Sequence, residues 1–138
     1  MSEKIILHGR PVVGGKVTAE ALVTKDYISG WGGVSTQTGE ILEVRHELRG
    51  QSFKGKILVF PGAKGSSGWS LTFHIARLNG CAPAGMIFNV MNTKMGLGAV
   101  VVGAPAVTDL DRDPIEVIRT GDIVTIDGDT GTVEIERK

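Results

Sequence analysis

The sequence predicts a single α/β domain in which strands outnumber helices. The first observation is an unbroken apolar run, Ile57–Phe60, followed by a glycine-rich turn, an amphipathic segment and a second apolar run at 84–90, which is the order strand, helix, strand. The second is alternation at 122–126 and 132–135 around D-G-D-T-G, which is typical of a β-hairpin. The third is glycine, 20 of 138 residues, much of it paired at apparent turns.

The N-terminal half should contribute two strands and a long loop before the central unit. A strand is expected at 16–24, after the Gly14-Gly15 turn, and a weaker one at 41–48. Between them, 26–39 reads as a loop, and loops of this length in a small domain are often functional.

The helix of the central unit is expected at 70–79. Leu71, Ile75 and Leu78 stand at i, i+4 and i+7, which places them on one face. Asn79-Gly80 is a stop signal for this helix. The crossover that joins the two flanking strands should be right-handed, as almost all such connections are.

The C-terminal half should hold further short elements. Short strands are expected at 99–102 and 106–107, and Asp113-Pro114 should cap a short helix that ends before Gly121. No composition shift marks an internal boundary, so residues 1–138 are expected to form one domain.

Charge and cysteine content narrow the function classes. Lys plus Arg equals Asp plus Glu at 15 each, whereas a general nucleic-acid or anionic-membrane binder usually carries a basic excess, so neither partner is expected. Cys81 is the single cysteine and cannot form an internal disulfide, which fits a reducing cytoplasm. The N-terminal apolar run is too short for a signal peptide, and no stretch approaches the roughly 20 apolar residues of a membrane helix. A cytoplasmic protein is expected.

The turn at 62–70, G-A-K-G-S-S-G-W-S, is the leading candidate site. A helix that starts just after it would point free backbone N–H groups at a ligand, and the expected ligand is an anion, a carboxylate or a phosphate. Lys64 adds positive charge, and Ser66 or Ser67 could cap the helix. The segment is not a P-loop, because Lys64 precedes the second glycine. An ordinary strand-to-helix turn with a capping serine explains the pattern equally well.

Other polar residues point to no metal site. His8, His46 and His74 are scattered without ligand spacing, and the alternating aspartates at 109–113 lack the glycine and distal glutamate of a calcium loop. These aspartates should form a solvated turn. Trp31, in a glycine-flanked loop, is either a contact residue or a cover over the core.

Four segments together resemble a known family. The chain is similar, from about residue 9 to 135, to the small, swivelling-domain subunit of aconitase X-type hydro-lyases. The resemblance is carried by A-L-V-T-K-D-Y-I-S-G-W-G-G-V at 21–34 with T-G at 38–39, G-K-I-L-V-F-P-G-A-K-G-S-S-G-W-S at 55–70, A-P-A-G-M-I-F at 82–88 and G-L-G-A-V-V-V at 96–102. Trp69 departs from the pattern, since small or aliphatic residues are common there.

The resemblance implies a fold, a partner and a site. The fold is a swivelling β/β/α domain like the last domain of aconitase. The partner is a large catalytic subunit, with which the chain forms a heterodimer and an interfacial active site. That subunit is expected to hold any iron–sulfur cluster or metal, and this chain to bind no cofactor. The family's serine in the K-G-S step corresponds to Ser66, the expected proton acceptor, with Lys64, Gly65 and Ser67 as substrate-binding residues.

The resemblance leaves the substrate open between two small hydroxy acids. The main expectation is dehydration of cis-3-hydroxy-L-proline, and the alternative is dehydration of mevalonate 5-phosphate. A phosphorylated substrate would favour more basic residues near the site, where the sequence reveals only Lys64.

Two further alternatives come from other function classes. The segment 121–133 also resembles the swivelling phosphohistidine domains of phosphoenolpyruvate-using enzymes, although the corresponding loop has no histidine and His74 lies well into the helix. A non-catalytic adaptor domain is the other alternative.

The face that meets the large subunit should be exposed in a lone subunit. Trp31, Trp69 and the glycine loops are expected to form it, and such a face could drive self-association.

Overall fold

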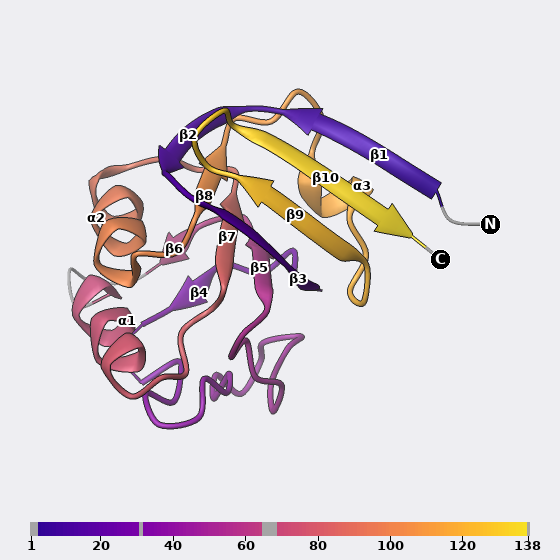
Figure 1. The fold of residues 1–138 in the computed structure, drawn as a ribbon. Helices are drawn as coiled ribbons and strands as arrows, with labels where there is room; N and C mark the ends of the chain where they lie inside the picture. The colour runs from indigo at the N-terminus through magenta and orange to yellow at the C-terminus, as the bar shows by residue number, and fades with distance from the viewer. Residues whose placement is uncertain (1–2, 31, 65–68, 138) are drawn as a thin grey trace.

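The structure is a computed structural model that describes residues 3–30, 32–64 and 69–137. Within these ranges, eight strands form one twisted mixed sheet in the order β1-β10-β9-β3-β5-β7-β8-β2, and β4 and β6 form a separate parallel pair (Figure 1). The strands are β1 (Glu3–His8), β2 (Arg10–Val13), β3 (Lys16–Val23), β4 (Ile28–Ser29), β5 (Ile57–Phe60), β6 (Ala63–Lys64), β7 (Gly85–Phe88), β8 (Ala106–Thr108), β9 (Ile123–Asp127) and β10 (Thr132–Arg137). The helices are α1 (Trp69–Leu78), α2 (Thr93–Val102) and α3 (Pro114–Val117).

The centre of the sheet is parallel. β3, β5, β7 and β8 run in one direction, and β9, β10, β1 and β2 add antiparallel neighbours at the two sides. β5 and β7 pair directly, with Ile57 opposite Gly85, and α1 connects them. The expected strand–helix–strand unit, the C-terminal hairpin and the strand-rich α/β class are therefore confirmed.

The central strands separate two hydrophobic cores. Side chains alternate along β5, so that Leu58 and Phe60 join the core under α1 and α2, while Ile57 and Val59 join the core formed with β9, β10 and α3. All four residues are buried. A strand covered on both faces has no polar side to present, which is why its sequence is an unbroken apolar run.

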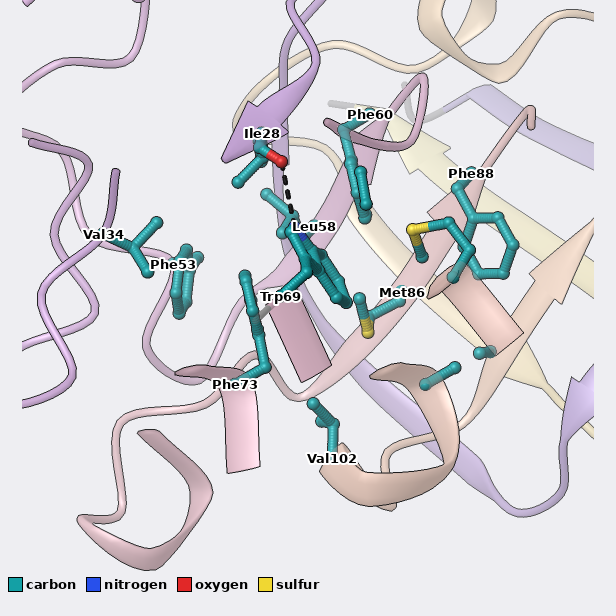
Figure 2. Packing of buried hydrophobic residues seen from close by; sticks show 14 of the residues in the cluster. Ile28, Val34, Phe53, Leu58, Phe60, Trp69, Phe73, Met86, Phe88 and Val102 are labelled. Atoms are coloured by element: carbon teal, nitrogen blue, oxygen red, sulfur yellow. Dashed lines mark hydrogen bonds between the residues drawn. The ribbon is translucent and has the colours of Figure 1, made fainter. Parts of the chain in front are cut away.

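Trp69, the first residue of α1, is the centre of the first core. Its indole stacks on Phe73 with ring centroids 4.1 Å apart, and Phe60 lies 6.3 Å away on the strand side. Its Nε1–H donates a hydrogen bond to the carbonyl oxygen of Ile28 at 2.9 Å, across a sequence separation of 41 residues (Figure 2). Only 1% of Trp69 is exposed. The expectation that Trp69 belongs to the exposed partner face is therefore wrong, and Trp31 lies outside the described residues.

The apolar face of α1 that the sequence singles out is turned to solvent. Leu71, Ile75 and Leu78 are 60%, 36% and 74% exposed, respectively. The buried residues of the helix are instead Trp69, Thr72, Phe73 and Ala76. Two aromatic rings fill the space against the sheet and α2 and contribute more buried area than the aliphatic set could, so packing decides which face is inside.

Two expected strands are not strands. Residues 99–102 belong to α2, whose N-cap Asn92 accepts a hydrogen bond from the Met95 N–H and which ends at Gly103 in the left-handed conformation (φ 70°). Capping at both ends outweighs the β-branched run inside. Residues 41–48 contribute only an isolated bridge between Ile41 and Val34, followed by turns. β1 and β2, at the N-terminus, were not anticipated.

A buried ion pair ties the last strand to α3. Arg137 donates to Asp122 through Nε and Nη2 and to the Val117 carbonyl oxygen, at 3.2, 2.9 and 2.6 Å. Asp122 is 7% exposed. Burial raises its pKa, but the Arg137 hydrogen bonds, the Arg119 backbone N–H and the charges of both arginines outweigh burial and hold the pKa below its ordinary value.

We expect Gly98→Ala to destabilise the protein although alanine favours helices. A Cβ at Gly98 would stand 2.0 Å from Cζ3 of Trp69, so the indole or α2 must shift, at a cost of about 1–3 kcal/mol. The matched control is Gly96→Ala in the same helix, where the new Cβ meets only the flexible end of Met91 at 3.1 Å. That variant should be neutral or stabilised by up to about 1 kcal/mol. Urea unfolding of both variants measures the difference, and equal stabilities would contradict the tight contact.

Asp122→Asn should lower stability by about 1–3 kcal/mol at pH 7, because Arg137 loses its charged partner. A carboxylate with a depressed folded-state pKa contributes stability above the ordinary Asp pKa of about 3.9, and this contribution is lost as the pH falls through the lower folded-state value. The gap between wild type and variant should therefore close in acid. Asp129→Asn, an exposed control, should stay within about 0.5 kcal/mol. A gap that persists unchanged to pH 2 would refute the charge-based explanation.

Candidate functional site

A hollow lined by charged side chains lies at one edge of the parallel sheet. Residues 25–27 follow the carboxyl end of β3, and β6 follows the carboxyl end of β5. Because β3 and β5 are parallel neighbours, these ends meet at the edge where open α/β sheets bind ligands. The cavity has a volume of about 570 Å³ and is lined by Lys25, Asp26, Tyr27, Glu43, Arg45, His46, Ala63 and Lys64.

Lys64 is fixed by its strand pairing and by a carboxylate. It lies opposite Ser29 in the β4–β6 ladder, and its Nζ is 2.6 Å from Oε1 of Glu43. The Ser29 hydroxyl donates to the same oxygen at 3.3 Å. About half of the Lys64 side chain is exposed, so solvent limits this ion pair to at most about 1 kcal/mol. The ion pair therefore orients the Lys64 side chain more than it stabilises the fold.

Glu47 holds two lining residues of the cavity, Lys25 and Asp26, through hydrogen bonds. Its Oε1 accepts hydrogen bonds from the Thr24 hydroxyl at 2.5 Å and from the Lys25 N–H at 2.7 Å. In return, Oδ2 of Asp26 accepts from the Glu47 N–H at 3.0 Å, and the Thr24 hydroxyl accepts from the Asp26 N–H at 2.9 Å. This network joins the end of β3 to the 43–48 segment and holds the backbone of Lys25 in place.

His46 has a structural contact rather than a catalytic one. Nδ1 accepts a hydrogen bond from the Leu48 N–H at 3.1 Å, so the proton of the neutral ring belongs on Nε2, which donates to the Tyr27 carbonyl oxygen at 3.1 Å. The residue is 6% exposed. Both ring nitrogens are engaged, and the ring locks the 43–48 segment against Tyr27.

The cavity carries more positive charge than the sequence suggested. Lys25 and Arg45 join Lys64 in its lining. In the sequence both lie far from the glycine-rich turn. The pairing of β3 with β5 brings Lys25 to it, and the hydrogen bonds between the end of β3 and the 43–48 segment bring Arg45. The available signal was the K-D-Y that directly follows a predicted strand, since residues after parallel strands gather at one edge.

The structure places one of the four predicted site residues. Lys64 lines the cavity, whereas Gly65, Ser66 and Ser67 lie outside the described residues. The roles assigned to those three stay predictions. The structure does describe the elements on both sides of them, β6 and α1, and so locates the two ends of the segment.

Other residues singled out in the sequence lie away from the cavity. His74 is exposed on α1, and Cys81 is buried, with its thiol donating to the Thr36 carbonyl oxygen at 3.1 Å. Asp109 pairs with Arg10 at 2.9 Å, and Asp113 caps α3 as expected. Across the part of the chain that the structure describes, no group of three His, Cys, Asp or Glu side chains could hold a metal ion. No described helix is both long enough and apolar enough to cross a membrane.

A second, apolar hollow flanks α1. It has a volume of about 390 Å³, and Leu71 and Ile75 form its helical side. Its remaining lining comes from the loop after β4 and from the helix: Gly32, Val34, Thr36 and Thr72. The exposed face of α1 is therefore a hollowed apolar surface.

Comparison with known proteins points to one family. Residues 6–135 match the family model described as the aconitase X swivel domain. A phosphomevalonate dehydratase small subunit of Methanocella arvoryzae is 42% identical, with 94% of this chain and 98% of the relative covered. Its counterpart in Archaeoglobus fulgidus is 40% identical over 91% and 95%. A crystal structure of Thermococcus kodakaraensis aconitase X in its holo-form superimposes with a TM-score of 0.89 at 37% identity, covering 95% of this chain and 98% of that one.

We expect Thr24→Val to destabilise the protein by about 1–3 kcal/mol. The substitution keeps the shape of a buried side chain but removes the hydroxyl that bridges Glu47 and the Asp26 N–H. Thr18→Val on the exposed side of β3 is the matched control, and its loss of the hydroxyl contact with Thr125 should change stability by less than about 0.5 kcal/mol. Chemical denaturation compares the two. Equal effects would show that the Thr24 hydroxyl does not organise the cavity wall.

Proposed function

The chain belongs to the aconitase X swivel domain family, and we propose that it is the small subunit of a phosphomevalonate dehydratase. The observation that carries this proposal is the set of near-full-length relatives, 36–42% identical, that bear that name in Methanocella, Thermococcus, Methanosarcina and Archaeoglobus. Membership of a dehydratase small-subunit family makes a large subunit the partner. Activity is a property of the pair.

The relatives favour the phosphorylated substrate over cis-3-hydroxy-L-proline, which was the main expectation from the sequence. The one argument against phosphomevalonate was the shortage of basic residues near the glycine-rich turn. The cavity beside that turn is lined by Lys25 and Arg45 in addition to Lys64, so this argument no longer applies. We therefore assign mevalonate 5-phosphate as the substrate.

The proposed reaction is a β-elimination of water. The C–H bond next to the substrate carboxylate breaks and its electron pair forms the C=C bond. The C–O bond to the hydroxyl breaks, and that oxygen leaves as water after gaining a proton. Ser66 is proposed to accept the proton from carbon. A serine hydroxyl is a weak base, so the developing negative charge needs stabilising groups around it.

Lys64 by itself is a poor activator of Ser66. Its ammonium group is already paired with Glu43 at 2.6 Å, which neutralises much of its field. The N-terminus of a helix adds roughly half a positive charge, worth on the order of 0.3–1 kcal/mol. These contributions fall short of what proton abstraction from carbon requires, so groups of the large subunit are proposed to complete the site, with Gly65 and Ser67 contacting substrate.

Two features of the chain support a partner that completes the enzyme. Leu71, Ile75 and Leu78 are exposed on one face of α1, and apolar surfaces of this kind mark protein interaction sites. Cys81, the single cysteine, is buried and hydrogen-bonded, so it does not fit as a cluster ligand. We assign any iron–sulfur cluster or metal to the large subunit, and no step above is routed through it.

Ser66→Ala should lower kcat of the reconstituted two-subunit enzyme by at least about 10²–10⁴-fold, because it removes the proton acceptor. The matched control is Ser70→Ala, four residues later in α1, which should retain near-wild-type kcat. Both variants should assemble with the large subunit, as judged by size-exclusion chromatography. Near-wild-type turnover by Ser66→Ala would remove this residue from the mechanism.

The substrate assignment is tested with the same complex. Turnover of mevalonate 5-phosphate and none of cis-3-hydroxy-L-proline is expected, with each subunit inactive alone. The reverse preference would replace the substrate while keeping the dehydratase. A complex that dehydrates neither compound would overturn the proposed function.

A further inference from the structure

We propose that Lys25 and Arg45 form a phosphate subsite on this chain, with the Tyr27 hydroxyl as an additional donor. The inference rests on the proposed function, because it identifies the groups that recognise the phosphate of the substrate. It goes beyond that function in assigning phosphate recognition to the small subunit and to two residues outside the glycine-rich turn.

The cavity geometry brings these side chains together. Lys25 and Tyr27 reach it from the segment after β3, and Arg45 reaches it from the 43–48 segment. All three are exposed, so a ligand can approach them without displacing the core. A volume of about 570 Å³ exceeds what a phosphate needs and leaves room for the carbon chain attached to it.

The backbone under these side chains is held in place. The Lys25 N–H donates to Glu47 at 2.7 Å, and the Tyr27 carbonyl oxygen accepts from His46 at 3.1 Å. The 43–48 segment is in turn closed by the hydrogen bond from the Glu47 N–H to Asp26 at 3.0 Å. Preorganised donors lose less entropy on binding than donors on a mobile loop.

The charges in the cavity leave these two cations free for a ligand. Glu43 is engaged by Lys64 and Ser29, and Asp26 accepts the hydrogen bond from the Glu47 N–H. Within the described ranges, neither Lys25 nor Arg45 forms an ion pair with an acid. The lining carries three cations, Lys25, Arg45 and Lys64, against two carboxylates, Asp26 and Glu43, so its formal charge is +1. Lys25 and Arg45 are the cations of this lining without an acid partner among the described residues.

The chemistry of these groups matches a phosphate monoester. Such a group carries about −1.5 to −2 charges at pH 7 and offers three acceptor oxygens. The planar guanidinium of an arginine can bind two of these oxygens in a fork, and the ammonium of a lysine acts as a point charge. A phosphate monoester carries more negative charge than a single carboxylate, so two neighbouring cations favour it.

The subsite also lies within reach of the proposed chemistry. Lys64 lines the same cavity, and in the sequence it directly precedes Gly65 and Ser66, the proposed reacting segment. In mevalonate 5-phosphate, a short ethyl-oxy arm joins the phosphorus to the carbon that loses its hydroxyl. One substrate can therefore contact Arg45 and Lys25 with its phosphate while its reacting carbons lie near the glycine-rich turn.

The test uses the reconstituted two-subunit enzyme with Lys25→Gln and Arg45→Gln. Each should raise KM for mevalonate 5-phosphate by about 10–100-fold, the usual effect of losing a hydrogen bond to a charged group. The change in kcat should be much smaller, because neither residue touches the reacting carbons. Arg45→Lys should restore part of the affinity. Arg49→Gln, at an exposed arginine just after the 43–48 segment and outside the cavity lining, is the matched control and should leave KM unchanged.

A binding measurement separates this inference from the proposed function. Inorganic phosphate, titrated into the complex by calorimetry, should bind to wild type and to Arg49→Gln but at least about tenfold more weakly to the two glutamine variants. Loss of phosphate binding in those variants supports the subsite even if the complex turns over a different phosphorylated acid. Wild-type KM and wild-type phosphate affinity in both variants would overturn it, whatever the complex dehydrates. Matching unfolding curves for all variants exclude a folding defect.

Discussion

The hydrogen bond from the Trp69 indole to the Ile28 carbonyl oxygen is the contact on which the arrangement around the site depends. It joins the first residue of α1 to β4, and β4 pairs with β6. The Trp69 side chain therefore connects α1 and β6, the two elements that flank the glycine-rich turn. Gly30 and Gly98 make this possible, because a Cβ at either would stand 2.7 Å or less from Trp69. The bulky Trp69 side chain is therefore accommodated by glycines rather than exposed.

The carboxyl edge of the parallel strands explains why chemistry and recognition can share one cavity. Lys25 and Tyr27 follow β3, and Lys64 lies in β6, which follows β5. The 43–48 segment contributes the remaining charged residues of the lining, Glu43 and Arg45, apart from Asp26. Asp26 and Glu43 at this edge form contacts within the protein, while Lys25 and Arg45 line the same hollow without an acid partner among the described residues. A small chain of zero net charge can thus offer a local anion site that its overall composition conceals.

The parts of the fold that were predictable are those with local causes. The apolar run of β5, the D-G-D-T-G hairpin and the Asp113-Pro114 cap each depend on residues a few positions apart, and all three appear as expected. The two errors have different causes, packing for α1 and competing local signals for α2. The buried face of α1 is decided by two aromatic rings that pack against the sheet, and residues 99–102 are helical because caps at Asn92 and Gly103 enclose a segment whose β-branched residues suggested a strand. For the site, Lys64 is indicated by its glycine neighbourhood, whereas Lys25 has only its place directly after a predicted strand as a signal and Arg45 has no local signature.

The sequence by itself determined the family, the strand-rich α/β class and the segment on which the proposed chemistry centres, because these are encoded in contiguous motifs and in short-range periodicity. Only the tertiary structure decided which face of α1 is buried, that Trp69 is a core residue, and which distant cations gather beside Lys64. The physical reason is that a sheet edge collects residues from separate strands. Their proximity is set by strand pairing and core packing, which no local run of residues records.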